Sequence, residues 1–341
     1  ERLGSDNKLV RLLTGRAKSN PKRVVFAEAD QLDVLKAAQI AYEEGIAVPI
    51  LLGRRDTILS LMEELEFDAD VQIIDPKSDE EIERKNKYAN AYWQQKMRKG
   101  ITKYAAQKIM RERNYFAAMM VNEGDADALI SGYSASYPKV VKPMLELIGM
   151  AKGVSRIATT NIMMTQRGPM FLSDTAININ PTAEDLAKIA YMTSKVAKMF
   201  GIDPVIAMTS YSNFGSSDNP NATKVRDAVA YLHKTYPDMV VDGELQMDFA
   251  LNSKMLQDIF PFSKLAGRKV NTLIFPNLDT ANITYKLLKE LNKAESIGPI
   301  MIGMRKPVHI LQLGASVDEI VNMVTVAVVD VQEREKRQHK K

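Results

Sequence analysis

The chain has 341 residues, of which 45% are hydrophobic and 26% charged, and its formal net charge is +4. This length exceeds the roughly 250–300 residues at which a single hydrophobic core stops growing, so two domains are expected. The absence of cysteine excludes disulfides, thiolate catalysis and cysteine metal sites. No apolar run approaches the ~20 residues of a membrane span, and no signal peptide is visible. We therefore expect a cytoplasmic protein. The polar start at Glu1 is expected for a domain cut from a longer chain, although removal of a tag would leave the same start.

Short β-rich runs alternate with amphipathic stretches along the whole sequence. Continuous apolar runs between helical patterns are typical of mostly parallel sheets with both faces covered, which places the chain in the α/β class. The predicted strands are residues 24–27, 48–52, 71–74, 128–131, 156–164, 170–175, 205–210, 239–242, 272–275, 299–302 and 308–311. The predicted helices include residues 33–44, 183–200, 224–235 and 280–291.

The segment 78–113 differs from the rest because it is highly charged and contains no candidate strand. It predicts two helices that cover a sheet or extend outward. Tyr88, Tyr92 and Trp93 fall at helical spacing, which favours core packing over a platform for a ligand. A domain boundary is expected near residues 149–156, where one helix ends and new strands begin.

The common nucleotide and metal motifs are absent from the sequence. There is no phosphate-binding P-loop and no G-x-G-x-x-G after a strand, so dinucleotide binding of the Rossmann type is not expected. The three histidines form no H-E-x-x-H pair, which argues against zinc or another metal. The positive excess lies mostly in residues 334–341 without interleaved aromatic residues, so a nucleic-acid partner is not expected either.

Three loops rich in small and hydroxyl residues follow predicted strands, and open α/β sheets bind ligands at the carboxyl ends of their strands. Loop 1, residues 131–137, offers hydroxyls and amides that favour an anion, or it is an ordinary serine-rich turn. Loop 2, residues 210–217, is a candidate phosphate cradle or a flexible polar loop. Loop 3, residues 308–316, ends in a capping box, which is a structural feature. The acidic turn 242–248 allows acid–base or metal chemistry, but a structural role is favoured.

Several ordered blocks are similar to the phosphate acetyl/butyryl transferase family and cover nearly the whole chain. The blocks are Ala126–Gly132, Ile179–Ala187, Ala207–Ser212, Val241–Asp248, Leu273–Leu278, Ala281–Lys286 and Ile297–Ile300. The resemblance implies two α/β/α domains of the isocitrate/isopropylmalate-dehydrogenase-like architecture. Domain I would comprise residues 1–151 plus 303–341. Domain II, an insertion of residues 152–302, would carry the dimer contact, for which the apolar run 189–199 is the candidate.

Active members of this family exchange an acetyl group between coenzyme A and phosphate, with an aspartate as base and a Ser and an Arg that bind the acyl phosphate. In loop 3 the resemblance assigns the base position to Ile310 and the Ser and Arg positions to Gln312 and Leu313. His309 is adjacent, but its side chain would have to turn the other way on a strand. The resemblance therefore implies that the catalytic groups are lost.

Two further departures concern phosphate-handling positions. In loop 2 the family usually has a threonine and a lysine where this chain has Asn213 and Phe214. In the helix after loop 1, Lys142 stands where the family usually has an arginine. The particular replacements at 210–216 and 306–311 resemble the C-terminal domain of large hybrid NADP-dependent malic enzymes.

This second resemblance implies a regulatory module that binds acetyl-CoA or CoA, oligomerises with itself and performs no acetyl transfer. No cofactor is expected in this part; NAD(P) and a divalent metal would belong to malic-enzyme domains of the same polypeptide, which decarboxylate malate to pyruvate. The alternatives are an active phosphate acetyltransferase and a purely structural scaffold. Arg98 is included among the binding residues because residues 97–100 resemble the family's coenzyme-binding region. The expected ligand-binding residues are Arg98, Ser131, Gly132, Tyr133, Ser134, Lys142, Ser210, Ser212, Asn213 and His309.

Overall fold

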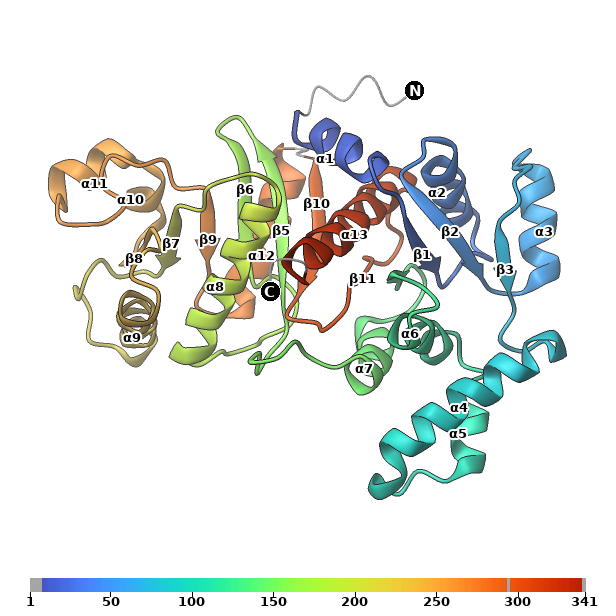
Figure 1. Ribbon diagram of the computed structural model, residues 1–341. Coiled ribbons are helices and arrows are strands. Elements are labelled where there is room, and N and C mark those ends of the chain that lie inside the picture. The colour runs from blue at the N-terminus through green and yellow to red at the C-terminus, as the bar shows by residue number, and fades with distance from the viewer. Residues whose placement is uncertain (1–7, 293–294, 339–341) are drawn as a thin grey trace. The chain divides into compact units, whose positions relative to one another are not determined.

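The computed structural model describes residues 8–292 and 295–338. The chain forms two compact units. The first unit contains residues 1–152 together with 304–341, and the second contains residues 153–303. Two mostly parallel sheets with intervening helices confirm the α/β class (Figure 1).

The first unit is built on a five-stranded parallel sheet in the order β11-β4-β1-β2-β3. Every residue of β4 is buried, because α13 packs against this strand and α6 packs against it as well. The C-terminal strand β11 pairs with β4, so both ends of the chain contribute to one sheet (Figure 1). The strands are β1 (Lys22–Phe26), β2 (Ala47–Leu52), β3 (Gln72–Ile74), β4 (Ala128–Ser131) and β11 (Val308–Ile310).

Most helices of the first unit lie between its strands in the chain, whereas α1 precedes β1 and α13 follows β11. The predicted capping box of α13 is confirmed: Ser316 N donates to Glu319 Oε2 at 2.9 Å, and Glu319 N donates to Ser316 Oγ at 3.3 Å. His339, Lys340 and Lys341 lie outside the described residues. The helices are α1 (Lys8–Lys18), α2 (Leu32–Glu43), α3 (Arg55–Glu64), α4 (Ile82–Lys96), α5 (Lys103–Ile109), α6 (Arg113–Glu123), α7 (Tyr137–Leu147) and α13 (Val317–Gln338).

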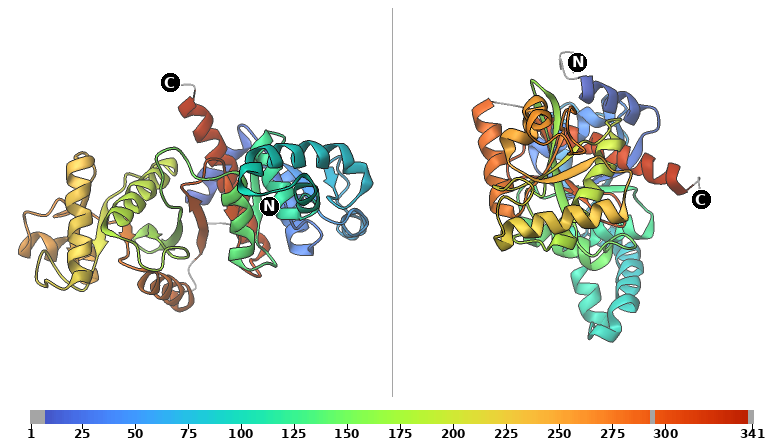
Figure 2. Two further views of the ribbon diagram at one scale, coloured as in Figure 1. Left: turned by 90° about the horizontal axis from the view of Figure 1, so that it is seen from below. Right: turned by 90° about the vertical axis from the view of Figure 1, so that its left-hand side faces the viewer.

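The charged segment forms the two predicted helices, α4 and α5, which pack against each other and extend away from the sheet as an arm (Figure 2). The short 3₁₀ turn η3 (Met97–Lys99) joins them and ends at Gly100, whose φ of 85° suits glycine. Tyr88 and Tyr92 are buried, as core packing requires, and the Tyr92 hydroxyl donates to Glu146 Oε1 at 2.6 Å.

The second unit is built on a six-stranded mixed sheet in the order β10-β5-β6-β9-β7-β8. The strands β6, β9, β7 and β8 run parallel, whereas β10, β5 and β6 pair antiparallel. The strands are β5 (Ala158–Thr165), β6 (Gly168–Ser173), β7 (Ile206–Thr209), β8 (Val241–Leu245), β9 (Thr272–Ile274) and β10 (Ser296–Ile302).

Helix α8 begins at a capping box formed by Thr182 and Asp185. The apolar run expected to form a dimer contact lies on this helix, but Ile189, Met192 and Val196 are buried inside the unit. That run is therefore core, which corrects its assignment as the contact surface, whereas the dimer itself stays a prediction. The helices of the second unit are α8 (Ala183–Met199), α9 (Pro220–Thr235), α10 (Met247–Leu251), α11 (Ser253–Ile259) and α12 (Leu278–Asn292).

Candidate functional site

Loop 1 forms an anion cradle, and the anion in it belongs to the chain itself. Glu28 follows β1 and is only 3% exposed. Its Oε2 accepts from the backbone N–H groups of Gly132 and Tyr133, each at 2.7 Å. Its Oε1 accepts from the backbone N–H of Ser134 at 3.0 Å and from the Ser134 hydroxyl at 2.6 Å. The amides expected to bind a ligand are therefore satisfied internally, and the sequence analysis missed their partner.

Further hydrogen bonds fix the same edge of the sheet. The Ser131 hydroxyl is buried and donates to Asn114 Oδ1 at 2.7 Å, and the Tyr133 hydroxyl donates to Asp33 Oδ2 at 2.7 Å. Arg113 forms a bidentate pair with Asp30, with both contacts at 2.8 Å. Burial alone would raise the pKa of Asp30, but the hydrogen bonds and charge of Arg113 hold it below its usual value. Ser131, Tyr133 and Ser134 of the loop are thus all hydrogen-bonded within the first unit.

Loop 3 lies next to loop 1, since β11 pairs with β4. Leu311 N donates to Ser131 O at 2.8 Å. Gly132 has a φ of 100°, and a Cβ at this position would lie 2.7 Å from the Ile310 side-chain atom Cγ2 and 3.2 Å from Leu311 O, so no larger residue fits against loop 3. Ile310 is buried, Gln312 is half-buried and Leu313 is 66% exposed. The positions that the resemblance assigns to chemistry carry no ionisable group.

His309 does not lie on an exposed surface as a ligand-binding residue would. Its side chain is 1% exposed and faces α13, with Nε2 3.9 Å from Asp330 Oδ2. Burial lowers the pKa of His309 to about 4, although the charge of Asp330 acts in the opposite direction. The imidazole is therefore neutral at pH 7 and enclosed in the first unit, which corrects its assignment to the ligand-binding set.

Loop 2, in the second unit, repeats the pattern of loop 1 around Glu244. This side chain is fully buried. Its Oε1 accepts from the Ser212 hydroxyl at 2.9 Å and from Gly215 N at 2.8 Å, and Arg226 Nη2 lies 3.2 Å away. Burial would raise the pKa of Glu244, but the Arg226 and Gly215 hydrogen bonds outweigh it and lower the pKa below its usual value.

The remaining polar residues of loop 2 are also used within the loop. Asn213 Oδ1 accepts from Gln246 N at 2.8 Å, and Ser210 Oγ accepts from Ser212 N at 3.3 Å. Phe214 adopts a φ of 43° and its ring lies 5.0 Å from that of Phe260. The loop therefore presents an aromatic side chain where the family usually has a cation.

Strand β8 spans Val241–Leu245, whereas the sequence predicted it at residues 239–242 because Asp242 and Glu244 are unusual inside a strand. Residues 242–245 of the expected acidic turn are strand, and Asp248 lies in the first turn of α10. Asp242 accepts from the Ser263 hydroxyl at 2.9 Å and from Lys264 N at 2.8 Å. Both carboxylates are thus buried with partners, as a strand interior demands. The structural interpretation of this motif holds, while its expected conformation was wrong.

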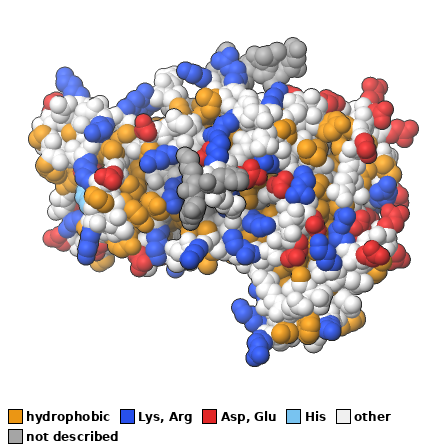
Figure 3. Space-filling model, in the orientation of Figure 1, with side chains coloured by type: hydrophobic (Ala, Val, Ile, Leu, Met, Phe, Trp, Pro, Cys, Tyr) orange, Lys and Arg blue, Asp and Glu red, His pale blue; other side chains and the backbone are white. Residues whose placement is uncertain are grey.

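The arm carries a long run of positive charge that no acidic residue of the same segment balances. Residues 84–111 contain nine Lys and Arg but no Asp or Glu. Among the described residues, those near the tip form no ion pair with a carboxylate, and Lys103 lies over the Trp93 ring at 4.6 Å. Figure 3 shows Lys and Arg side chains on the lower surface of the molecule, over α4 and α5. Among the residues that the structure describes, the arm cations for which no interaction with a carboxylate is found are Arg98, Lys99, Lys103, Lys108 and Arg111, whereas Lys96 acts on Glu146 through its charge.

Two expected binding residues thus remain available to a ligand in the first unit. Arg98 is exposed at the tip of the arm, and Lys142 is exposed on α7. Ser131 and Gly132 are buried, and Ser134 is committed to Glu28. No helix in the part of the chain that the structure describes has the length and apolarity needed to cross a membrane.

Comparisons with known proteins give a consistent result. A family model described as phosphate acetyl/butaryl transferase matches residues 8–328. The NADP-dependent malic enzyme of Haemophilus influenzae is 36% identical over 329 residues, which are 95% of this chain and 43% of that protein. The phosphate acetyltransferase of Thermoanaerobacterium thermosaccharolyticum is 37% identical over 331 residues, which are 95% of this chain and 99% of that protein.

Solved structures give the same result. EutD phosphotransacetylase from Staphylococcus aureus superimposes with a TM-score of 0.85 at 30% identity, covering 95% of this chain and 98% of that chain. A phosphotransacetylase from Streptococcus pyogenes gives a TM-score of 0.86 at 34% identity, covering 95% and 99%. The chain therefore spans less than half the length of the malic enzymes it matches. It spans nearly all of some phosphate acetyltransferases and less than half of others, such as that of Nitratidesulfovibrio vulgaris, of which 45% is covered.

Proposed function

Because the chain belongs to the phosphate acetyl/butaryl transferase family, we propose that it is an acetyl-CoA-binding module that has lost acetyl transfer. The observation that carries the binding part is the arm, whose cations near the tip have no carboxylate partner among the described residues. Clustered Lys and Arg side chains attract phosphate groups through charge-assisted hydrogen bonds. Coenzyme A carries several phosphates, so the arm offers the complementary charge.

The loss of chemistry rests on loop 3. Acetyl transfer to phosphate needs a base and cations that stabilise charge in the transition state, and their loss typically costs factors of 10²–10⁴ and about 3–4 kcal/mol, respectively. Here the side chain at the assigned base position, Ile310, is buried and apolar, and Leu313 stands where a cation is expected. In loop 2, Phe214 stands where the family usually has a lysine, so a further cation is lost. The resemblance identifies these positions, and the structure supplies no ionisable replacement at them among the described residues.

We assign the module to the C-terminal regulatory region of a malic enzyme. The similarity to malic enzymes covers 95% of this chain but only 43% of the relative, as a domain of a larger protein would. In this assignment acetyl-CoA is an effector, and malate decarboxylation with NAD(P) and a divalent metal takes place on other domains of the same polypeptide.

A second candidate function is phosphate acetyltransferase activity. It is favoured by the match to a phosphate acetyltransferase along 99% of that protein's length, at an identity as high as that of the malic enzymes. The two candidates differ in one observable, which is acetyl phosphate formation from acetyl-CoA and phosphate. Binding of acetyl-CoA without this reaction supports the regulatory module.

We also propose that the chain associates with a second copy of itself through α12. One face of this helix packs inward through Ala281 and Tyr285. The opposite face exposes Ile283, Leu287 and Leu291, each more than half exposed and four residues apart. A helix that is apolar on two faces is usually covered on both, and a two-fold contact is the commonest arrangement of identical subunits.

Calorimetric titration of the 341-residue chain with acetyl-CoA tests the binding proposal. Losing a charge-assisted contact costs about 1.5–3 kcal/mol, so Arg98→Ala is expected to weaken binding roughly ten- to a hundredfold. Arg55→Ala removes an exposed cation of α3, outside the arm, and is expected to leave binding unchanged. Absence of binding to the unmodified chain contradicts the proposal, whereas equal binding by the Arg98 variant contradicts only the site.

A further inference from the structure

The first unit separates its charges by sign between two neighbouring segments. Residues 63–83 contain ten Asp and Glu and a single Lys, whereas residues 84–111 contain nine Lys and Arg and no acidic residue. The first segment runs from the end of α3 through the 3₁₀ turn η2 (Asp79–Glu81) into the start of α4, and the second forms the arm. The first unit thus carries an acidic edge, residues 63–83, and a basic arm.

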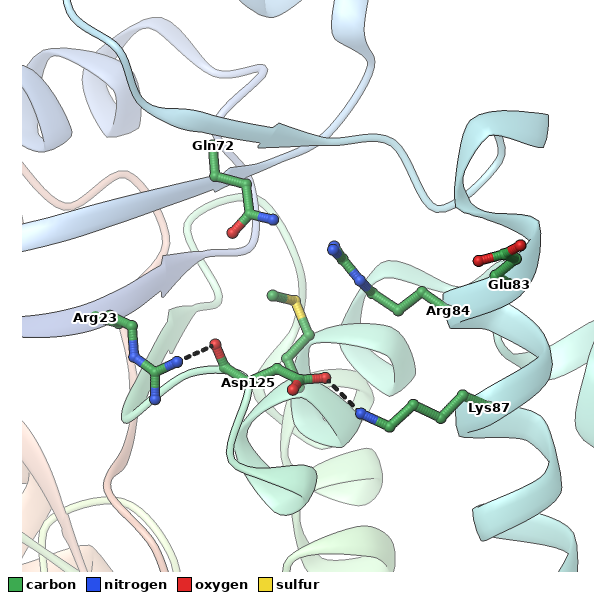
Figure 4. Close-up of a pocket in the computed structure, with 7 residues that line it drawn as sticks. Arg23, Gln72, Glu83, Arg84, Lys87 and Asp125 are labelled. Atoms are coloured by element: carbon green, nitrogen blue, oxygen red, sulfur yellow. Dashed lines mark hydrogen bonds and ion pairs between the residues drawn. The ribbon is translucent and has the colours of Figure 1, made fainter.

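The cations at the base of the arm are paired within the chain. Figure 4 shows Lys87 on α4 directed toward Asp125, and its Nζ donates to Asp125 Oδ2 at 3.2 Å. Arg84 Nη1 lies 3.2 Å from Glu81 Oε2 in a second ion pair. Contacts within the unit therefore neutralise the base of the arm, and its uncompensated positive charge lies toward the tip.

The tip of the arm combines these cations with exposed apolar side chains. Tyr104 on α5 is 75% exposed, and Met97 in η3 is 45% exposed. Arg98, Lys99 and Lys103 are exposed in the same turn, and no carboxylate partner for them is found among the described residues. Tyrosine, methionine and arginine are enriched in protein interfaces, so the tip has the composition of a contact surface.

The acidic edge has the complementary composition. Eight of its ten carboxylate side chains are exposed, and no cationic partner for these eight is found within residues 8–292 and 295–338. Ile82, at the start of α4, is 50% exposed among them. Figure 3 shows Asp and Glu side chains along the right-hand edge, over α3 and the start of α4, and Lys and Arg side chains at the lower end of the arm.

From this complementarity we propose that the tip of the arm docks on the acidic edge of a second copy of the chain. The tip cannot reach the acidic edge of its own chain, because α4 is a continuous helix of 15 residues that holds the tip roughly 20 Å from the start of α4. Surfaces of opposite charge direct docking and fix its register. The two surfaces differ, so the contact is head-to-tail and can repeat from copy to copy, unlike a two-fold contact.

Sedimentation velocity of the 341-residue chain tests the proposal at about 0.1 M and about 1 M NaCl, where the Debye length is about 10 Å and about 3 Å. Association through the arm is expected at the lower salt concentration and lost at the higher one, whereas an apolar contact through α12 persists. Two variants reverse the charge of one surface each: Lys99→Glu with Lys103→Glu on the arm, and Glu64→Lys with Asp68→Lys on the acidic edge. Each is expected to weaken the salt-sensitive association at least about tenfold, because like charges then face each other. The chain that carries all four substitutions is expected to regain it, because the two signs are exchanged.

Lys198→Glu with Lys234→Glu is the matched control, since it changes the net charge as the arm variant does but reverses exposed cations of the second unit, and it should leave the association unchanged. All the substituted positions are exposed, so the variants are expected to fold, which circular dichroism checks.

Four results overturn the proposal. One is no salt-sensitive association of the unmodified chain at concentrations up to about 0.1 mM. Another is unchanged association of the folded arm and edge variants. The third is no recovery in the chain with all four substitutions, and the fourth is an equal loss in the control. The edge variant alters no residue proposed to bind acetyl-CoA, so the two proposals are judged separately.

Discussion

Replacing Glu28 with glutamine tests whether loop 1 is held in place by the chain's own carboxylate. The carboxylate accepts four hydrogen bonds, three from backbone N–H groups and one from the Ser134 hydroxyl. Glutamine has almost the same shape but keeps a single acceptor oxygen. Its best orientation places that oxygen on the Gly132 and Tyr133 amides, and its NH₂ group then faces the Ser134 amide, which is itself a donor.

The expected cost follows from these bonds. One charge-assisted hydrogen bond, worth about 1.5–3 kcal/mol, is lost, and the two bonds from Gly132 and Tyr133 weaken by about 1 kcal/mol each because the charge is gone. Local opening of loop 1 should therefore become easier by roughly 3–5 kcal/mol. Since 1.4 kcal/mol is a factor of ten, amide hydrogen exchange in the loop is expected to accelerate at least a hundredfold.

Hydrogen exchange of the peptide that contains residues 131–137 is the assay. Glu64→Gln, an exposed carboxylate of α3, is the matched control and should leave exchange in the loop unchanged. A urea titration followed by the single tryptophan, Trp93, reports the stability of the first unit alone. An acceleration below threefold in Glu28→Gln would refute the view that the carboxylate holds the loop.

Three further predictions concern other parts of the chain. Arg226→Met should raise the pKa of Glu244 by roughly one unit, which ¹³C NMR titration of the carboxyl carbon measures. Because this pKa is depressed in the folded state, the ionised Glu244 stabilises the fold above about pH 4.5, and this stabilisation is lost as the pH falls through the folded-state pKa. In the variant the loss should occur at higher pH. Because His309 is buried in its neutral form, the free energy of unfolding of the unmodified chain should fall by up to about 3 kcal/mol as the pH falls from 6.5 to about 4. In urea titrations, His309→Leu should make this pH dependence less steep. An equally steep dependence in the variant would contradict the prediction. Since the chain has no cysteine, a single introduced cysteine can be cross-linked selectively. A short bis-maleimide should join Leu287→Cys chains into dimers but should not join Leu59→Cys chains, whose cysteine lies on α3. Equal yields of cross-linked dimer from the two variants would contradict a contact through α12.

The fold was largely predictable because hydrophobic periodicity is a local signal. Continuous apolar runs such as residues 48–52 and 308–311 correspond to β2 and β11, and the Ser316–Glu319 capping box identifies the start of α13. The clearest error, β8, arose because Asp242 and Glu244 look like turn residues. Nothing local in the sequence shows that Ser263 and Arg226 provide their partners.

The site was less predictable because its contacts join residues that lie far apart in the sequence. The serines and glycine of loop 1 suggested an anion cradle, and the cradle exists, but its anion comes from Glu28, more than 100 residues earlier in the chain. The burial of His309 likewise depends on α13 packing over β11. Exposed cations such as Arg98 are readable from sequence, whereas a buried polar network depends on contacts that only the tertiary fold creates.

The most direct test of the central claim combines binding and chemistry on the same preparation. The 341-residue chain is mixed with acetyl-CoA and phosphate, and acetyl phosphate is measured as its hydroxamate, with EutD phosphotransacetylase from Staphylococcus aureus as the positive control. Calorimetry on the same sample measures acetyl-CoA binding. The account predicts saturable binding with acetyl phosphate formation at least 10⁴-fold below the control, as expected when a general base and a transition-state cation are both missing. Acetyl phosphate formation at a rate comparable to the control would contradict it and establish the acetyltransferase instead.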